Sequence, residues 1–173
     1  VNASQRQPHQ LLGMHPMGDG SGVVARALLH NAAQVEVVPV VERNRPRFQL
    51  NRLNDCGLFE GATKDANRVY AYDLVVTDYQ GATRQFRDPY SFLPTMGETD
   101  LYLFGEGNER RIYDKLGAQL RTIDGVRGTS FAVWAPNAQR VSVVGPFNNW
   151  DGRYHPMRPL GASGVWELFV PDL

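Results

Sequence analysis

The chain has 173 residues, enough for one large domain or two small ones, and 42% of them are hydrophobic. Its 18 basic and 18 acidic residues leave no net charge, which argues against a surface that follows the phosphates of nucleic acid. A neutral polysaccharide, which is recognised by aromatic faces and hydrogen bonds, fits this composition better.

The single cysteine and the distribution of apolar residues bear on location. Cys56 has no partner for an internal disulfide, so a reducing compartment such as the cytoplasm is expected. No apolar run approaches the ~18 residues of a membrane span. The polar start of the chain lacks the basic end and apolar run of a secretory signal. We therefore expect a cytoplasmic protein with no membrane partner.

Turn residues divide the chain into short segments, with 17 glycines and 11 prolines among them. Segments rich in Val, Phe, Trp and Leu lie, in chain order, at 23–29, 35–41, 69–77, 130–135, 140–144 and 165–170. This spacing predicts an all-β fold built from β-sandwiches. Only a turn at 9–12 and the segment 108–116 are predicted to be helical, the latter because Ile112, Tyr113 and Leu116 recur at helical spacing.

The sequence also repeats itself. A shift of 106 positions places Gly22 on Gly128 and Asn31 on Asn137. The same shift aligns further residues: Val35, Val37 and Val38 with Val141, Val143 and Val144, Arg47-Phe48 with Arg153-Tyr154, and Arg52 with Arg158. One inserted residue then brings Glu60 and its neighbours onto Glu167 and its neighbours. We interpret these matches as two copies of one module.

The first copy extends further than the second. After Glu60 it continues through residues 67–90, which read as a β-hairpin turning near Gln80-Gly81. In the second copy the counterpart of Ala66 is Leu173, and nothing matches the hairpin. We therefore expect an incomplete second module with an open strand edge and an uncovered apolar face, completed downstream in a longer protein.

The resulting architecture is all-β, with two tandem immunoglobulin-like β-sandwich modules and a truncated second copy. The first module is expected at 9–92 and the second at 127–173. The segment 93–126 is expected to be a partly helical connector, because its mixed charge and helical spacing set it apart from the modules.

Several motifs resemble bacterial glycogen branching enzymes. They are Leu12-Gly13-Met14-His15-Pro16, Asp88-Pro89-Tyr90-Ser91-Phe92, Asp100-Leu101-Tyr102-Leu103-Phe104, Phe131-Ala132-Val133-Trp134-Ala135-Pro136-Asn137, and Phe147-Asn148-Asn149-Trp150-Asp151-Gly152-Arg153 followed by His155-Pro156-Met157-Arg158. The last two resemble the family 48 carbohydrate-binding modules. Related motifs also occur in debranching enzymes, trehalose-forming hydrolases and non-catalytic kinase subunits that bind glycogen.

The resemblance implies a parent enzyme of glycogen biosynthesis in the α-amylase superfamily. Such an enzyme cleaves an α-1,4-glucan and transfers the severed chain to a 6-hydroxyl, using two carboxyl groups on a (β/α)₈ barrel. A barrel needs about 250 residues, so we assign no catalytic residue and no cofactor to this chain. The expected partners are an α-1,4-glucan such as glycogen and a catalytic domain downstream in the same chain.

Three residues are the candidates for contact with sugar. Trp150 lies in a polar loop, where its ring can stack on the C–H face of a glucose unit while Asn148 and Asn149 reach sugar hydroxyls. The alternative is that Trp150 packs against the catalytic barrel. Trp134 and Trp166 lie within apolar strands and are expected in the core.

No metal site is expected, because the four histidines show no ligand-like spacing. Three functions remain open. The modules are those of a branching enzyme, or they are glucan-binding modules of a debranching or trehalose-forming enzyme or of a non-catalytic regulator, or they are purely structural supports.

Overall fold

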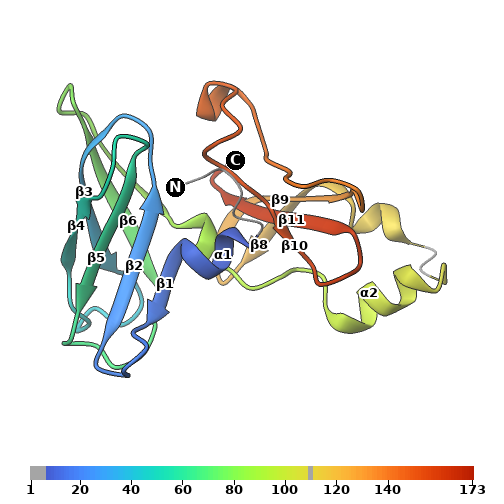
Figure 1. Cartoon of the computed structure of the whole chain (residues 1–173), viewed down its shortest axis with the longest axis horizontal. Helices are drawn as coiled ribbons and strands as arrows, with labels where there is room; N and C mark the ends of the chain where they lie inside the picture. Colours follow the sequence, from blue (N-terminus) through green and yellow to red (C-terminus); the bar gives the residue numbers. More distant parts are fainter. Residues whose placement is uncertain (1–6, 109–110) are drawn as a thin grey trace. The chain divides into compact units, whose positions relative to one another are not determined.

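The computed structural model describes residues 7–108 and 111–173, and it consists of two compact β units (Figure 1). The units comprise His9–Ser91 and Phe92–Leu173. Every strand pair is antiparallel. The predicted all-β fold, with short helical segments between two β units, is confirmed. Within the described residues, no helix is long and apolar enough to cross a membrane.

The first unit is a seven-stranded arrangement in the order β1-β2-β5-β4-β3-β6-β7. A short helix, α1 (Pro8–Leu11), precedes its strands: β1 (Gly13–Pro16), β2 (Val23–Leu28), β3 (Ala32–Pro39), β4 (Phe48–Arg52), β5 (Leu58–Thr63), β6 (Tyr72–Asp78) and β7 (Thr83–Arg87). Strand β4 changes partner along its length, because Leu50 pairs with Val35 of β3 whereas Asn51 pairs with Glu60 of β5. This change of partner lets the strands form the two layers of a sandwich.

Alternating apolar residues make the core of this unit. Val23 and Ala25 of β2, Val37 of β3, and Leu74 and Val76 of β6 are all buried, and each lies two residues from another buried position. Period-two burial of this kind is what a strand with one covered face produces. The core cluster also includes Phe59 and Tyr72.

The hairpin expected near Gln80-Gly81 is confirmed as β6 and β7. The side chain of Asp78 stabilises its turn, since Oδ1 accepts hydrogen bonds from the backbone of Gln80 and of Ala82, both at 2.9 Å. Gly81 has φ +86°, a conformation that glycine adopts without steric cost.

A buried carboxylate follows the hairpin. Asp88 accepts a hydrogen bond from the Tyr90 backbone at 2.9 Å and another from the Tyr72 hydroxyl. Burial raises the pKa of Asp88 to about 6, although both hydrogen bonds act in the opposite direction. Asp88 therefore joins the segment that follows β7 to the core. Its burial favours the neutral, protonated form of the carboxyl group.

The second unit is a four-stranded sheet in the order β10-β11-β9-β8. Its elements are α2 (Glu98–Gly105), β8 (Gly117–Ile123), β9 (Val126–Trp134), β10 (Arg158–Pro159), β11 (Val165–Pro171), and the 3-10 turns Ile112–Asp114 and Pro146–Asn148. Strand β8 lies inside the segment 93–126 that we assigned to the connector. Its exposed Leu120 stands between Gln119 and Arg121, so the strand carries no apolar pattern that the sequence could reveal.

Two local predictions of secondary structure were wrong. The α-helix forms at Glu98–Gly105, not at 108–116, where residues 109–110 lie outside the described residues and the rest contains one 3-10 turn. Asp100 stabilises α2 by accepting from the Gly97 backbone at 3.2 Å and from Lys115 at 2.9 Å. The apolar segment 140–144 forms only an isolated bridge, between Ser142 and Pro156, because no described strand pairs with its other side.

The core of the second unit surrounds β11, all of whose residues are buried. Trp166 is buried as predicted, and its indole N–H donates to the carbonyl of Ala135 at 3.0 Å. The prediction for Trp134 was wrong, since 55% of its surface is exposed. Trp134 is the last residue of β9, where its ring makes an edge-to-face contact with Phe104.

Candidate functional site

The loop between residues 145 and 153 carries all three residues predicted to contact sugar. It begins with a 3-10 turn, Pro146–Asn148, and Pro146 suits this first helical position because its missing N–H would have no partner there. Asn149 and Trp150 follow directly and are exposed, whereas Asn148 is buried. The three residues therefore lie in one loop, but one side chain is buried and the other two are exposed.

The side chain of Asn148 holds the loop together from inside. Its Oδ1 accepts from the Gly145 backbone, and its Nδ2 donates to the carbonyl of Val143, both at 2.9 Å. Nδ2 also lies 2.9 Å from Nδ1 of His155. Because an amide nitrogen only donates, His155 Nδ1 is the acceptor in this contact. Because these contacts use the side-chain amide, Asn148 stabilises the conformation of the loop.

Trp150 is presented to solvent by an uncommon backbone conformation. Asn149 and Trp150 have φ of +55° and +59°, in the left-handed region that bulky residues rarely adopt. The backbone N–H of Trp150 donates to Gly145 at 2.9 Å, which closes the turn. As a result, 68% of the Trp150 surface is exposed. Two consecutive left-handed residues cost roughly 1–3 kcal/mol each, a cost typically found where strain serves a ligand or partner.

Further aromatic and charged groups border the ring. Phe147 is partly exposed and meets His155 edge to face, with ring centroids 5.3 Å apart. Asp151 binds Arg153 at 2.5 Å, and the Arg153 guanidinium lies over the ring of Tyr154, 5.6 Å from its centroid. The loop therefore offers an indole bordered by polar groups, a combination suited to a neutral ligand with one apolar face.

The described residues of this loop include no pair of carboxyl groups arranged for acid–base catalysis. Asp151 forms an ion pair with Arg153, and Glu167 is fully buried. Retaining glycosidases require two carboxyl groups about 5–5.5 Å apart on either side of the scissile bond. No group of three His, Cys, Asp or Glu side chains is arranged to hold a metal in the described part of the chain.

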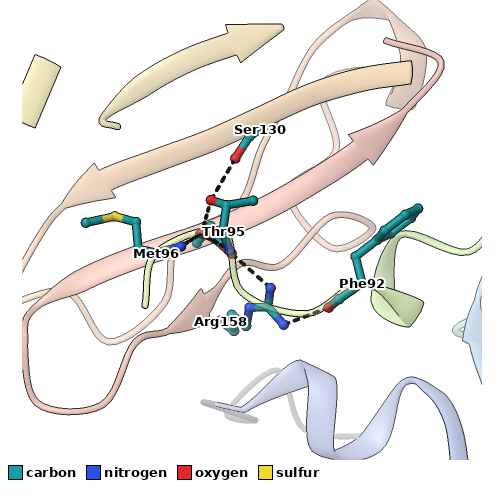
Figure 2. A network of polar contacts seen from close by, with 6 residues as sticks. Phe92, Thr95, Met96, Ser130 and Arg158 are labelled. Atoms are coloured by element: carbon teal, nitrogen blue, oxygen red, sulfur yellow. Dashed lines mark hydrogen bonds and ion pairs between the residues drawn. The ribbon is translucent and has the colours of Figure 1, made fainter. Parts of the chain in front are cut away.

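A second polar cluster, which the sequence analysis missed, includes Thr95, Met96 and Arg158 (Figure 2) and is centred on the carboxylate of Glu167. This carboxylate accepts from the backbone of Thr95 at 2.9 Å and of Met96 at 3.2 Å, and also from the Thr95 hydroxyl. Arg158 donates to the same carboxylate at 2.8 Å and to the Phe92 carbonyl at 2.9 Å. The cluster fixes residues 92–96 to the sheet. The sequence feature that could have indicated this cluster is Glu167, a single glutamate inside the apolar strand Val165–Pro171.

The corresponding loop of the first unit differs. The repeat aligns Trp150 with Asn44 and Phe147 with Val41, so that loop has no indole. Instead, Glu42 binds Arg45 at 2.8 Å and Arg68 at 3.0 Å, and both contacts lower the pKa of Glu42. The two loops that the sequence alignment pairs therefore differ, since only the second carries an indole.

Two parts of the chain match models of known protein families. Residues 1–90 match the model described as "alpha-1,4-glucan branching enzyme GlgB, N-terminal domain". Residues 115–173 match "Carbohydrate-binding module 48 (Isoamylase N-terminal domain)", and this second match includes β8 and the Trp150 loop. Among solved structures, pullulanase from Klebsiella pneumoniae is similar over 93% of this chain and 19% of its own, with 16% identity and a TM-score of 0.27.

Relatives match along the whole chain. The 1,4-alpha-glucan branching enzyme GlgB of Myxococcus xanthus is 48% identical over 180 residues, which cover 100% of this chain and 23% of that protein. The protein of the same name from Pseudomonas fluorescens Pf-5 is 49% identical over 176 residues, covering 100% and 22%. This chain thus spans less than a quarter of the length of these relatives. With its first half matched by the family model, the chain belongs to the family of the alpha-1,4-glucan branching enzyme GlgB N-terminal domain.

Proposed function

We propose that this chain is the non-catalytic front region of a 1,4-alpha-glucan branching enzyme, and that its second module binds α-glucan for a catalytic domain downstream. The chain covers 22–24% of the length of three relatives, from Myxococcus xanthus, Pseudomonas fluorescens Pf-5 and Cellvibrio japonicus, each named 1,4-alpha-glucan branching enzyme GlgB. The branching reaction, the glycogen substrate and the catalytic partner belong to that longer protein. The free, exposed thiol of Cys56 suits the reducing cytoplasm.

One observation carries the binding proposal: Trp150 is exposed, and hydrogen bonds hold the backbone of its loop. A loop that is already ordered loses less conformational entropy when a ligand binds, so more of the contact with the ring appears as affinity. The buried Asn148 amide and the closing bond from Trp150 to Gly145 provide this preorganisation. Glucose units of an α-1,4-glucan offer the C–H face that an indole prefers.

The three loop residues take separate roles in this proposal. Trp150 stacks on a glucose unit. Asn149 is exposed and adjacent, so its amide is placed to bond sugar hydroxyls. Asn148 is a positioning residue, since its amide is already bonded within the loop.

The module boundaries are also part of the proposal. We take residues 9–92 as the first module and extend the second module to the start of β8 at Gly117. The pairing of β8 with β9 across seven residues supports this extension. The remaining connector, from residue 93 to β8, is then attached to the second module through the Glu167 cluster.

The competing proposal makes the second module a structural support whose Trp150 packs against the catalytic domain. Glycogen co-sedimentation with the 173-residue chain separates the two. The binding proposal predicts that the chain sediments with glycogen, that maltoheptaose releases it, and that Trp150→Ala weakens sedimentation at least fivefold. Tyr102→Ala serves as the matched control, because Tyr102 is 66% exposed in the same unit but lies on α2. Failure of the unaltered chain to sediment with glycogen would refute glucan binding and favour the support.

A further inference from the structure

Three turns meet at one end of the first unit (Figure 1). They connect β2 to β3, β4 to β5, and β6 to β7. The Leu29 backbone donates to the Gly57 carbonyl at 2.8 Å, which joins the first turn to the second. The Asn31 amide donates to Oε1 of Gln80 at 3.3 Å, which joins the first turn to the third. The turns therefore form one continuous surface.

Tyr79 lies on this surface, directly after β6, and is 61% exposed. Its ring is held by Arg52, whose guanidinium carbon lies 6.0 Å from the centroids of both Tyr79 and the buried Phe59. Arg52 also donates a hydrogen bond to the Tyr79 hydroxyl. An exposed tyrosine of this kind is fixed through its hydroxyl and one neighbouring cation, while most of the ring meets solvent.

The guanidinium that holds the ring is itself fixed. Nε of Arg52 donates to the Asn54 carbonyl at 3.0 Å, and Nη2 donates to the Asp55 carbonyl at 3.2 Å. Both acceptors lie in the turn between β4 and β5, whose shape Asn54 stabilises by accepting from the Cys56 backbone at 3.1 Å. The position of Tyr79 is thus determined by a chain of contacts that leads back to the sheet.

The uncharged side chains of Asn31 and Gln80 lie on the same surface as Tyr79 and carry hydrogen-bonding groups. The single bond between Asn31 and Gln80 uses Nδ2 of the first and Oε1 of the second. Within residues 7–108 and 111–173, Oδ1 of Asn31 and Nε2 of Gln80 make no further hydrogen bond, which leaves an acceptor and two donors on exposed side chains. Oδ1 of the nearby Asp78 carboxylate already accepts two hydrogen bonds from the turn backbone.

From this arrangement we propose a second α-glucan subsite on the first unit, in which Tyr79 stacks on a glucose unit and Asn31 and Gln80 bond its hydroxyls. It rests on the proposed function for its ligand, since that function makes α-glucan the polymer that this chain binds. The subsite uses the β6–β7 turn and not the counterpart of the Trp150 loop, which carries Val41 and Asn44.

Residue-resolved NMR of the 173-residue chain, titrated with maltoheptaose, tests the subsite. We expect saturable shifts of the amides of residues 29–31, 53–57 and 79–82, separate from those of residues 147–152. Tyr79→Ala should weaken binding at the first group at least tenfold and leave the second unchanged. Tyr79→Phe, which keeps the ring and removes the hydroxyl, should weaken it less than threefold. Tyr102→Ala should change neither group.

The outcomes separate this subsite from the proposed function. Shifts confined to residues 147–152 would overturn the Tyr79 subsite and leave the Trp150 loop intact. Shifts confined to the first group would support the subsite and contradict the Trp150 loop, and no shifts at millimolar maltoheptaose would overturn both. A spectrum of Tyr79→Ala that matches the unaltered chain outside the three turns shows that the unit remains folded.

Discussion

Arg158 and Glu167 face each other across the β10–β11 pair, with Nη2 of the arginine 2.8 Å from Oε1 of the glutamate and both side chains buried. The same carboxylate accepts the backbone N–H groups of Thr95 and Met96. One ion pair therefore attaches the connector segment to the second sheet. Because the charges are removed from water, the structure depends on both partners being present.

Glu167→Gln is expected to lower the free energy of unfolding of the second unit by about 3 kcal/mol or more, since it leaves Arg158 buried without an opposite charge. Replacing both partners, Arg158→Met with Glu167→Leu, should recover only part of this loss because Thr95 and Met96 then lose their acceptor. Tryptophan fluorescence during urea unfolding measures the effect selectively, since Trp134, Trp150 and Trp166 all lie in this unit.

The repeat provides a matched control for this prediction. Glu60 aligns with Glu167, but its ion pair with Arg26 is partly exposed. Glu60→Gln should cost less than about 1 kcal/mol in the first unit, as measured by circular dichroism. Equal losses for the two variants would contradict the importance of burial.

Asn148 tests the internal support of the Trp150 loop. Asn148→Ala removes the acceptor for Gly145 and the donor for Val143, leaving buried backbone groups without partners. We expect a loss of about 2–4 kcal/mol in unfolding free energy. Asn149→Gly is the control, since it retains the left-handed conformation and removes only an exposed side chain. A stable Asn148→Ala variant would show that the amide does not hold the loop.

Asp88 makes the first unit sensitive to pH. Its pKa is about 6 in the folded chain against an ordinary value of 3.8, so the folded state binds the proton more tightly. The resulting contribution of about 3 kcal/mol is present below pH 4 and is lost as the pH rises through 6.

Asp88→Asn isolates this contribution, because its amide stays neutral and keeps an acceptor for the Tyr90 backbone. The difference in unfolding free energy between the unaltered chain and Asp88→Asn should change by about 2 kcal/mol between pH 4 and pH 7.5, most of the full contribution, because the unfolded carboxyl is already partly ionised at pH 4. Circular dichroism of urea unfolding measures it across that range. Parallel pH profiles would mean that the folded pKa is ordinary.

Much of the fold could be predicted from the sequence, because it rests on local patterns. The β6–β7 hairpin follows from alternating apolar residues around Gln80-Gly81, and the clustering of Trp150 with its two asparagines follows from their adjacency. Strand β8 could not be predicted, since a polar strand forms there only through pairing with β9.

The surroundings of individual side chains were harder to predict. Asn148 and Asn149 are equivalent in the sequence, yet a 3-10 turn directs the first inward and leaves the second in solvent. Trp134 and Trp166 both lie in apolar strands, but β11 is covered along its length whereas β9 is uncovered at its end. Both differences depend on which segment covers a face, and that is decided by tertiary packing.

The chain itself should leave amylose unbranched and unhydrolysed. Asp151 is paired with Arg153 and Glu167 is buried, so neither is placed to act on a glucan bound at Trp150. Prolonged incubation with amylose, followed by iodine staining and analysis of debranched chains, checks this. Reproducible α-1,6 branch formation by the purified chain would contradict the assignment of a non-catalytic region.

The most direct test of the central claim is the affinity of the Trp150 loop for α-glucan. Calorimetric titration with maltoheptaose, in a Tyr79→Ala background that leaves one proposed site, compares Trp150 with Trp150→Ala. Loss of an exposed stacking ring should weaken binding about tenfold or more, by analogy with the 1–3 kcal/mol of base stacking on aromatics. The melting temperature should stay within about 2 °C, because Trp150 is exposed. Unchanged affinity in a folded Trp150→Ala variant would contradict glucan binding by this loop.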